Sequence, residues 1–458
     1  MTDTTLANAL RAAGADYVYL PGSADYAAEL AAFNPNVRHQ PDAVVAARTP
    51  LDVAAAIAVA SGHGVDVIPL GLGHGVLRDA DGGIAISTRG LASVRLDLEN
   101  RTARVGAGTS WAEVLETVTP HGLAPLCGSA PGVGVIGYVL GGGMGPIARS
   151  HGFAADHVQS IEIVTPADGY IVATPEQHSD LFWGLRGGGK LGFGVVVAVT
   201  LDLFPIETLY GGGMFFAAED AKAVLDAWAV WSRDLPLCVS TSVAMVRVPP
   251  LPELPEPIRG KFVLHLRFAD LDTADDAEAR LAAIRSVATP LIDYIGEMPY
   301  AAIGAIHQDP VVGTPVTEGG VTLSALPQEA VDALWAVAGD AAEVPLLAVE
   351  LRLLGGKVGE APLDANAVGG RDGAYSLFVV SAPIPELLET VLPQVIGGVF
   401  SAVEEWHATE LLTNFVGRAN GPDALRRSWS PEVLQRLESI RDAADPDGIF
   451  AAKTAILA

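Results

Sequence analysis

Cysteine and basic residues are scarce in this chain. Two cysteines among 458 residues, Cys127 and Cys238, form neither a disulfide framework nor a metal site of recognised spacing. Lys and Arg together number 28, against 54 Asp and Glu, so the formal net charge is −26. A field of that sign repels polyanions. The composition therefore argues against nucleic acid and anionic membrane surfaces as partners.

Long hydrophobic runs are absent as well. Half of the residues are hydrophobic, yet apolar stretches such as 53–60 and 195–200 are far shorter than the roughly 20 residues of a membrane-spanning helix. The first residues, MTDTTLANAL, have neither the basic nor the apolar segment of a secretory signal. We therefore expect a cytoplasmic protein without a membrane partner.

Glycine, by contrast, is concentrated in two segments, 71–75 (GLGHG) and 106–145. Glycine allows a ligand to lie against the main chain, and consecutive N–H groups in glycine-rich turns bind anions. The two segments therefore indicate a large phosphate-bearing cofactor, with the imidazole of His74 pointed at it. The alternatives are two ordinary glycine-rich turns and a structural histidine, because no other metal-type ligand lies beside His74 in the sequence.

Two nucleotide-binding signatures in this chain are discounted. Residues 132–137 match the dinucleotide pattern G-x-G-x-x-G, but Ala130-Pro131 precede them where that motif requires a buried strand. Residues 184–190 imitate a P-loop, but Leu191 occupies the position of the Ser or Thr that binds magnesium. Neither pattern identifies the cofactor.

The pattern of expected elements indicates an α+β fold with two different halves. Up to about residue 205, short strands alternate with helices at 52–61 and 110–118. From about 210 to 395, long alternating strands are separated by amphipathic helices, which fits an antiparallel sheet with helices on one face. The expected strands are 239–248, 260–268, 346–354 and 375–381, and the expected helices are 218–233, 274–287 and 328–338.

A set of short segments recurs in a recognisable order along the chain. They are 71–75, 106–108, 121–123, 128–134, 140–143, 151–152, 156–158, 164–165, 180–183, 185–189, 414–415 and 445–450. In this order the chain resembles the FAD-linked oxidoreductases of the vanillyl-alcohol oxidase/p-cresol methylhydroxylase superfamily, and among them the bacterial berberine-bridge-enzyme-like group. The resemblance covers almost the whole chain and is strongest over 41–205.

The resemblance implies a domain organisation. It implies a two-part α+β FAD-binding domain of the PCMH type over 1–207, with its core at about 37–207. An antiparallel-sheet substrate domain at 208–410 is inserted before a C-terminal segment, 411–458, that returns to the FAD-binding domain.

The resemblance also implies FAD as the cofactor, joined covalently to His74 through the flavin 8α-methyl carbon. Many members carry a second link through a cysteine at the position of Ala130. Cys127 does not align with that position, so we expect one covalent bond. The residues implied to bind FAD are Leu70, Gly71, Leu72, Gly73, His74, Gly75, Ser129, Pro131, Val133, Gly134, Gly137, Gly141, Gly142, Gly143, Gly152, Asp156, Val164, Asn414, Phe450 and Lys453.

The implied activity is that of an FAD-dependent oxidase, which takes a hydride onto flavin N5 from a small organic substrate of the alcohol, sugar or secondary-metabolite type. Reoxidation by O2 would give hydrogen peroxide, because in this group a small residue at the position of Val133 accompanies reactivity with oxygen. The alternatives are a flavin dehydrogenase with another electron acceptor and a non-catalytic flavin-binding protein.

Oxidation of an alcohol also requires a base. The tyrosines that sugar-oxidising relatives use near the C-terminus are missing, since Trp429-Ser430 occupy that region. The candidates for the base are Glu350 and Tyr375, each on an expected sheet strand. Further pocket candidates are Arg352, His307, Asp309, Ser376 and Phe378. The alternative for each of these residues is an ordinary sheet or surface position.

Overall fold

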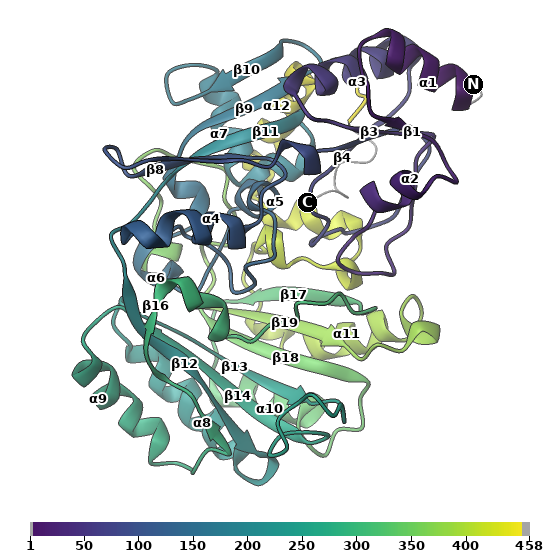
Figure 1. The fold of residues 1–458 in the computed structure, drawn as a ribbon. Coiled ribbons are helices and arrows are strands. Elements are labelled where there is room, and N and C mark those ends of the chain that lie inside the picture. The colour runs from purple at the N-terminus through teal and green to yellow at the C-terminus, as the bar shows by residue number, and fades with distance from the viewer. Residues whose placement is uncertain (1–2, 451–458) are drawn as a thin grey trace.

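The computed structural model describes residues 3–450. Its N-terminal sheet has the strand order β1-β3-β6-β4, in which β3, β6 and β4 run parallel (Figure 1). The strands are β1 (Val18–Tyr19), β3 (Ala43–Ala46), β4 (Val67–Leu70) and β6 (Ile84–Ser87), with a separate pair β2 (His39–Gln40) and β5 (Ala80–Asp81). The helices of this part are α1 (Asp3–Ala12), α2 (Ala24–Glu29) and α3 (Pro50–His63).

Helix α3 confirms the helix expected at 52–61 and extends it at both ends. The side chain of Thr49 accepts a hydrogen bond from Asp52 N, and Pro50 occupies the first turn, where an N–H would have no helical partner. Gly64 ends the helix with a left-handed φ of +62°. Val53 packs in one core with the strands of this sheet.

A second, antiparallel sheet completes the first part of the chain, in the order β10-β9-β11-β8-β7. Its strands are β7 (Val94–Asp97), β8 (Thr102–Gly106), β9 (Val158–Thr165), β10 (Gly169–Ala173) and β11 (Val195–Asp202). The accompanying helices are α4 (Trp111–Val118), α5 (Val135–Leu140), α6 (Ala148–His151) and α7 (Ser179–Gly188). Ser110 caps α4 in a capping box with Glu113, which confirms the helix expected at 110–118.

The third sheet is antiparallel, in the order β15-β12-β14-β13-β18-β19-β17, with β16 paired to β12. Its strands are β12 (Thr208–Ala217), β13 (Val239–Arg247), β14 (Phe262–Asp270), β15 (Ile292–Asp293), β16 (Gly296–Pro299), β17 (Glu318–Leu323), β18 (Leu346–Leu353) and β19 (Tyr375–Ser381). Its helices are α8 (Ala218–Trp231), α9 (Ala274–Arg285), α10 (Gln328–Ala338) and α11 (Leu392–Ser401). The α+β class and the antiparallel sheet are confirmed.

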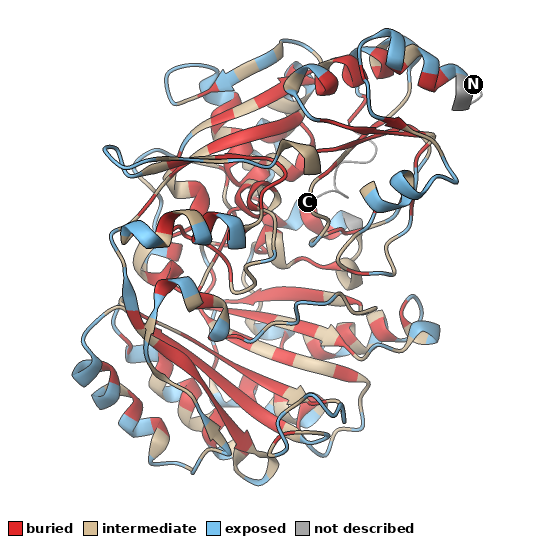
Figure 2. Ribbon diagram, in the orientation of Figure 1, coloured by how far each residue is buried: buried red, intermediate tan, exposed pale blue. Residues whose placement is uncertain are grey.

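The two faces of this third sheet differ in chemistry. Side chains alternate between faces along a strand, and on the helix-covered face Leu266 and Leu351 belong to the buried core. On the opposite face, Arg267, Glu350 and Arg352 lie at the alternate positions. This polar face is the one turned toward the first part of the chain (Figures 1 and 2).

The end of the chain returns to the first part. Helix α12 (Pro431–Ala444) contacts α7, and Ile449 and Phe450 pack in the same core as α3. No helix within residues 3–450 is long and apolar enough to cross a membrane.

Candidate functional site

The loop after β4 presents His74 to solvent. The carbonyl of Leu70 accepts a hydrogen bond from Thr88 N at 2.8 Å, which fixes the start of the loop. Gly73 has a left-handed φ of +75°, and its carbonyl accepts from Phe33 N at 3.0 Å. The exposed His74 ring lies 4.6 Å from the ring centroid of Phe33. A defined backbone thus holds an accessible imidazole.

Two charged residues from distant parts of the chain act on His74. Although solvent reaches the ring, the surrounding protein partly desolvates it, and this lowers the pKa of His74. The carboxylate of Asp309 raises that pKa and the ammonium of Lys190 lowers it, so that the net shift is downward. The imidazole is therefore neutral near neutral pH, with a lone pair on one ring nitrogen.

The loop before α5 lies against the His74 loop. An added Cβ at Gly134 would lie 3.2 Å from Leu72 Cγ, so the Leu72 side chain covers this glycine. Ser129 Oγ donates a hydrogen bond to Asp309 Oδ2 at 2.6 Å. Val133 is half-buried and packs against the main core. The loop therefore joins the His74 loop to Asp309.

The glycines of the two glycine-rich segments fall into two groups. At Gly71 and Gly132, an added Cβ would meet no atom within 4 Å, so a ligand can approach the main chain there. At Gly141, Gly142 and Gly143, the same atom would lie 2.0, 3.1 and 2.5 Å from protein side chains. Protein packing, and not ligand approach, explains these last three glycines. The remaining predicted glycines of the two loops and α5 are half-buried: Gly73, Gly75, Gly134 and Gly137.

Lys190 lies next to Gly141, and its side chain is largely buried. Its Cε is 3.0 Å from the Cβ position of Gly141, and the residue is 6% exposed. Burial lowers the pKa of Lys190 to about 8. Within the described part of the chain no hydrogen bond or ion pair joins its ammonium group to another residue. In the sequence, Lys190 was considered only as part of a false P-loop. Its position directly after a run of glycines was the signal that could have marked it as a ligand-binding residue.

On the polar face of the third sheet, one carboxylate holds two arginines. Arg267 Nη1 and Arg352 Nη2 lie 3.2 and 3.1 Å from Glu350 Oε1, and the three side chains are 10, 12 and 13% exposed. Burial alone would raise the pKa of Glu350, but the charges of Arg352 and Arg267 outweigh it and hold the pKa well below its usual range. A carboxylate of such low pKa is a weak proton acceptor. The expectation that Glu350 is the base is therefore not supported, and the geometry favours a role in holding the guanidinium groups.

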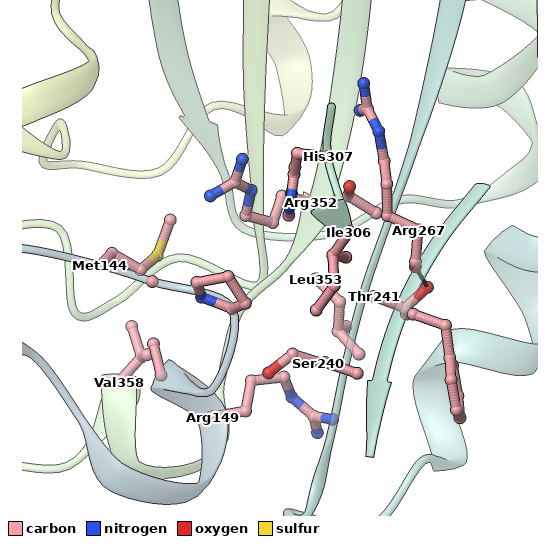
Figure 3. Close-up of a pocket in the computed structure, with 16 residues that line it drawn as sticks. Met144, Arg149, Ser240, Thr241, Arg267, Ile306, His307, Arg352, Leu353 and Val358 are labelled. Carbon is pink, nitrogen blue, oxygen red and sulfur yellow. Dashed lines mark hydrogen bonds between the residues drawn. The ribbon is translucent and has the colours of Figure 1, made fainter. Parts of the chain in front are cut away.

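His307 lies between these two arginines (Figure 3). Its Nε2 is 3.8 Å from Glu350 Oε1, too far for a hydrogen bond. Neither ring nitrogen has a hydrogen-bond partner among residues 3–450. Burial first, and then the charges of Arg352 and Arg267, lower the pKa of His307 to about 3, so the imidazole is neutral. The sequence analysis did not identify Arg267 as a site residue. The available signal was that Arg267 and His265 occupy alternate positions of an otherwise apolar strand.

The first part of the chain has recognisable relatives. Residues 41–175 match the protein family described as FAD binding domain. This part of the chain is an FAD-binding domain. It includes His74, both loops around it and the 141–143 glycines.

Curated relatives match less than half of the chain. An FAD-dependent monooxygenase of Cochliobolus heterostrophus is 35% identical over 176 residues, 38% of this chain and 34% of that relative. An FAD-linked oxidoreductase of Aspergillus niger is 30% identical over 205 residues, 43% of each chain. The chain thus matches about a third to two fifths of the length of these relatives. Both organisms are fungi, so the expected placement among bacterial members gains no support.

Solved structures share the whole fold. BBE-like 1 of Physcomitrella patens has a TM-score of 0.82 at 19% identity over 97% of each chain. Glucooligosaccharide oxidase from Acremonium strictum has a TM-score of 0.83 at 22% identity over 99% of each chain. 6-Hydroxy-D-nicotine oxidase from Arthrobacter nicotinovorans has a TM-score of 0.80 at 19% identity, over 94% of this chain and 96% of that one. At these identities the likeness defines the fold.

The exposed loops of the FAD-binding domain fit FAD. Gly71 and Gly132 leave main chain open to a ligand, and His74 offers an accessible ring nitrogen. Lys190 supplies a largely buried positive charge that has no partner among residues 3–450, and a phosphate or flavin oxygen would neutralise it. These are the residues that would hold the cofactor.

Two residues implied to bind FAD are engaged by the protein instead. Asp156 accepts hydrogen bonds from Arg371 Nη2 at 2.5 Å, Asn366 Nδ2 at 2.7 Å and Phe153 N at 2.9 Å. Gly152 lies against the same carboxylate, since a Cβ there would be 2.7 Å from Asp156 Oδ2. The Asp156 side chain therefore ties the FAD-binding domain to the segment after β18.

Three further residues implied to bind FAD also direct their side chains to the protein. Asn414 Nδ2 donates to the carbonyl of Tyr138 at 2.8 Å and so attaches the C-terminal segment to α5. Val164 and Phe450 are 1% and 0% exposed and pack in one core. Lys453 lies outside the described residues.

Tyr375 lies on the opposite face of the sheet from Glu350. It pairs in register with Leu353, its hydroxyl is 3.1 Å from Ser232 Oγ, and its ring packs 5.8 Å from that of Trp228 in α8. The expectation that Tyr375 is the base is therefore wrong, because side chains alternate between faces along β19.

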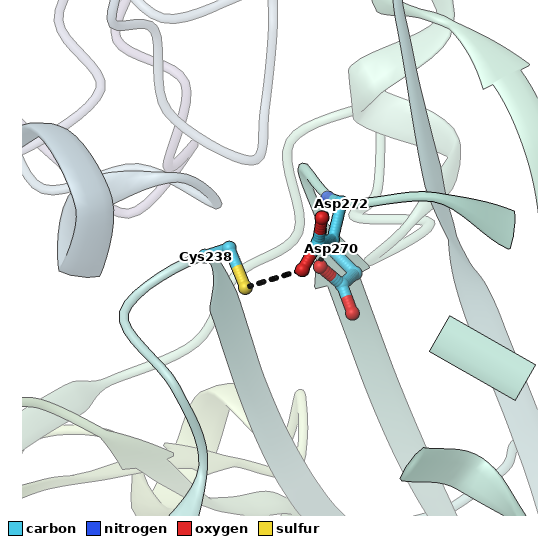
Figure 4. A group of neighbouring side chains, drawn as sticks. All are labelled: Cys238, Asp270 and Asp272. Carbon is cyan, nitrogen blue, oxygen red and sulfur yellow. Dashed lines mark hydrogen bonds between the residues drawn. The ribbon is translucent and has the colours of Figure 1, made fainter. Parts of the chain in front are cut away.

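One cluster of possible metal ligands occurs among residues 3–450 (Figure 4). The ligand atoms of Cys238, Asp270 and Asp272 lie within 4.8 Å of one another. Arg280 already pairs with Asp270 at 2.5 Å and with Asp272 at 2.8 Å, and burial first, then Asp270, raises the thiol pKa of Cys238 to about 11. The cluster is an ion-pair network and carries no metal assignment.

Proposed function

We propose that the protein is an FAD-dependent oxidase. When bound, FAD would accept a hydride at N5 from a small organic substrate and would pass both electrons to O2, which would give hydrogen peroxide. The observation that carries this proposal is the accessible, neutral His74 on the FAD-binding domain, electrostatically coupled to Asp309. Asp309 in turn acts on His307 at the polar face of the sheet, so the cofactor loop and the substrate side adjoin.

In this proposal FAD is held by a single covalent bond, at His74. Glucooligosaccharide oxidase carries FAD with both a cysteinyl and a histidyl link. Here the nearest cysteine, Cys127, is fully buried, and burial raises its pKa to about 12. The thiolate, which is the nucleophilic form, is therefore not available.

The substrate lies against the polar face of the third sheet. His307 is a neutral imidazole there, with both ring nitrogens free of partners among residues 3–450. Its pKa of about 3 makes it, like Glu350, a weak proton acceptor, so it offers the substrate a hydrogen bond and not a base. Glu350 is occupied by Arg267 and Arg352. The solved oxidases of this fold act on oligosaccharides and 6-hydroxy-D-nicotine, which supports a small organic substrate.

Absorbance spectra before and after acid precipitation test the proposal first. We expect yellow colour to stay in the pellet of the wild-type protein and to leave it in His74→Ala. His63→Ala, which removes an exposed histidine at the end of α3, serves as the matched control and keeps the colour. A protein that neither contains nor takes up FAD would overturn the proposal.

Oxygen use is tested through Val133. We expect Val133→Leu to slow reoxidation of the reduced flavin by O2 severalfold while leaving anaerobic reduction unchanged. Hydrogen peroxide should form in equal amount to the oxygen consumed. Turnover that needs a dye instead of O2 would favour a dehydrogenase, and incorporation of an oxygen atom from O2 into the product would favour a monooxygenase.

A further inference from the structure

Polar groups without protein partners gather in one cavity of the molecule (Figure 3). The cavity lies between the segment 144–149 of the FAD-binding domain and strands β13, β14 and β18 of the third sheet. Arg267, Arg352 and His307 line it, and Figure 3 shows their side chains at the same end. The proposed function places a substrate against this face, and these groups decide which chemical class of substrate binds there.

The cavity has an excess of positive charge. Arg267 and Arg352 share a single carboxylate, that of Glu350. Asp309, whose charge also acts on His307, does not line the cavity and accepts a hydrogen bond from Ser129. Arg149 also lines the cavity, so three guanidinium groups accompany the single carboxylate of Glu350. In a chain with a net charge of −26, this largely buried positive excess is an exception. A buried charge without a counterion is destabilising, so the site favours an anionic ligand.

Arg149, another arginine that lines the cavity, has its donors paired with main-chain carbonyls. Arg149 donates from Nε to the Leu354 carbonyl at 2.9 Å and from Nη1 to the Pro236 carbonyl at 3.1 Å. By contrast, Nε of Arg352 has no hydrogen-bond partner among residues 3–450, nor has either nitrogen of His307. Donors that are buried and unpaired destabilise a protein until a ligand accepts their hydrogen bonds.

We propose that the substrate of this oxidase is an organic acid whose carboxylate binds in this cavity, against Arg352, Arg267 and His307. A carboxylate supplies negative charge, and its two oxygens match the planar donors of a guanidinium group. A neutral sugar would leave the positive charge uncompensated. The inference rests on the proposed oxidase function and names the substrate class.

Binding of a matched pair of probes tests the site. The flavin-containing protein is titrated with benzoate and with benzamide, which has the same shape without the charge. Flavin absorbance changes and the melting temperature report binding independently. We expect benzoate to bind at least tenfold more tightly than benzamide. Equal affinities would overturn the proposal without any variant being needed.

Variants then locate the carboxylate. Arg352→Met should raise the benzoate Kd at least tenfold and leave the weak benzamide binding unchanged. Arg104→Met, which removes an arginine of a half-exposed ion pair on β8, should leave both unchanged. If Arg352→Met fails to fold, Arg352→Lys keeps the charge but lacks the Nε donor, and it should still weaken benzoate. An unaltered benzoate Kd in the soluble Arg352 variants would overturn the proposal.

The two proposals fail in different ways. A protein without FAD would contradict the oxidase function. Melting in the presence of benzoate requires no flavin, so a selective rise in melting temperature with benzoate would still support the carboxylate site, and its absence would contradict it.

Discussion

Two buried charged sites differ in how the protein neutralises them. On the polar face of the sheet, Glu350 stands between Arg267 and Arg352 and pairs with both. At the FAD-binding domain, Lys190 is 6% exposed, and no partner for its ammonium occurs among residues 3–450. The first site is partly balanced by its own carboxylate. The second is balanced only when an anion is bound, and this difference marks Lys190 as a ligand-directed group.

Of the variants considered, removal of the Glu350 charge should have the largest effect on the free energy of unfolding. Glu350→Gln leaves two largely buried guanidinium groups without a counterion, and we expect a loss of about 3–5 kcal/mol in the free energy of unfolding. Urea denaturation measures it. Glu360→Gln, the same change in an exposed pair with Lys357, should cost about 0–1 kcal/mol. A loss of less than 1 kcal/mol in Glu350→Gln would show that the network does not stabilise the fold.

The pH dependence of this effect has a defined sign. The folded pKa of Glu350 lies below its usual range, so its stabilisation is fully present above the unfolded value of about 4.3. It is lost as the pH falls through the folded pKa. The difference in stability between wild type and Glu350→Gln should therefore be constant from pH 8 to 5 and shrink on further acidification.

Lys190→Met, unlike Glu350→Gln, should raise the free energy of unfolding of the cofactor-free protein. Burial lowers the pKa of Lys190 from 10.5 to about 8, so below pH 8 the buried ammonium destabilises the cofactor-free protein by about 3 kcal/mol. Methionine removes that penalty, and the gain should fade as the pH rises from 8 to 10.5. The measurement is urea denaturation of protein stripped of FAD, in the His74→Ala background.

With FAD bound, Lys190→Met should be unfavourable and not stabilising. With the cofactor present, Lys190→Met is expected to weaken FAD binding at least tenfold, because the anionic cofactor loses its buried cation. Lys261→Met, at an exposed lysine, provides the control for both measurements. Stabilisation by methionine that persists with FAD bound would show that Lys190 does not face the cofactor.

The regular elements were more predictable than the site. Alternation of apolar residues identified the strands around 239–247 and 346–353 and the helix Gln328–Ala338. Strand β12 was missed, because the consecutive glycines at 211–213 break its alternation. The domain limits at 207 and 410 stay predictions.

Site residues depend on which face a strand presents and on long-range neighbours. Tyr375 and Ser376 are adjacent in sequence, yet only the face of Ser376 is polar, and the sequence pattern gave no means to choose. Lys190 and Asp309 reach His74 from segments more than a hundred residues away. Resemblance located the His74 loop because that motif is local, whereas long-range packing brings together the residues of the polar face.

Gly141→Ala tests the packing around Lys190 with a smaller effect. The added Cβ would lie 2.0 Å from Asn414 Oδ1 and 3.0 Å from Lys190 Cε, and overpacking of this kind costs about 1–3 kcal/mol. Gly132→Ala, whose Cβ meets no atom within 4 Å, should change stability by less than about 1 kcal/mol. Asn414→Ala in the Gly141→Ala background should recover part of the loss. Equal effects of the two glycine substitutions would contradict the division of glycines into packing and ligand-facing positions.

The smallest effect is expected at Cys127, a buried ionisable group that stays neutral. Its thiol is 0% exposed and 3.9 Å from Tyr300 Oη, and burial raises its pKa to about 12. Unlike Glu350 it needs no counterion, and unlike Lys190 it presents no charge to a ligand. Cys127→Ala should therefore leave the ratio of covalently bound flavin to protein unchanged after acid precipitation, while His74→Ala abolishes it. A pellet of Cys127→Ala that loses flavin, or whose flavin spectrum shifts, would mean that this thiol reacts with the cofactor, and that the single covalent bond at His74 is the wrong description.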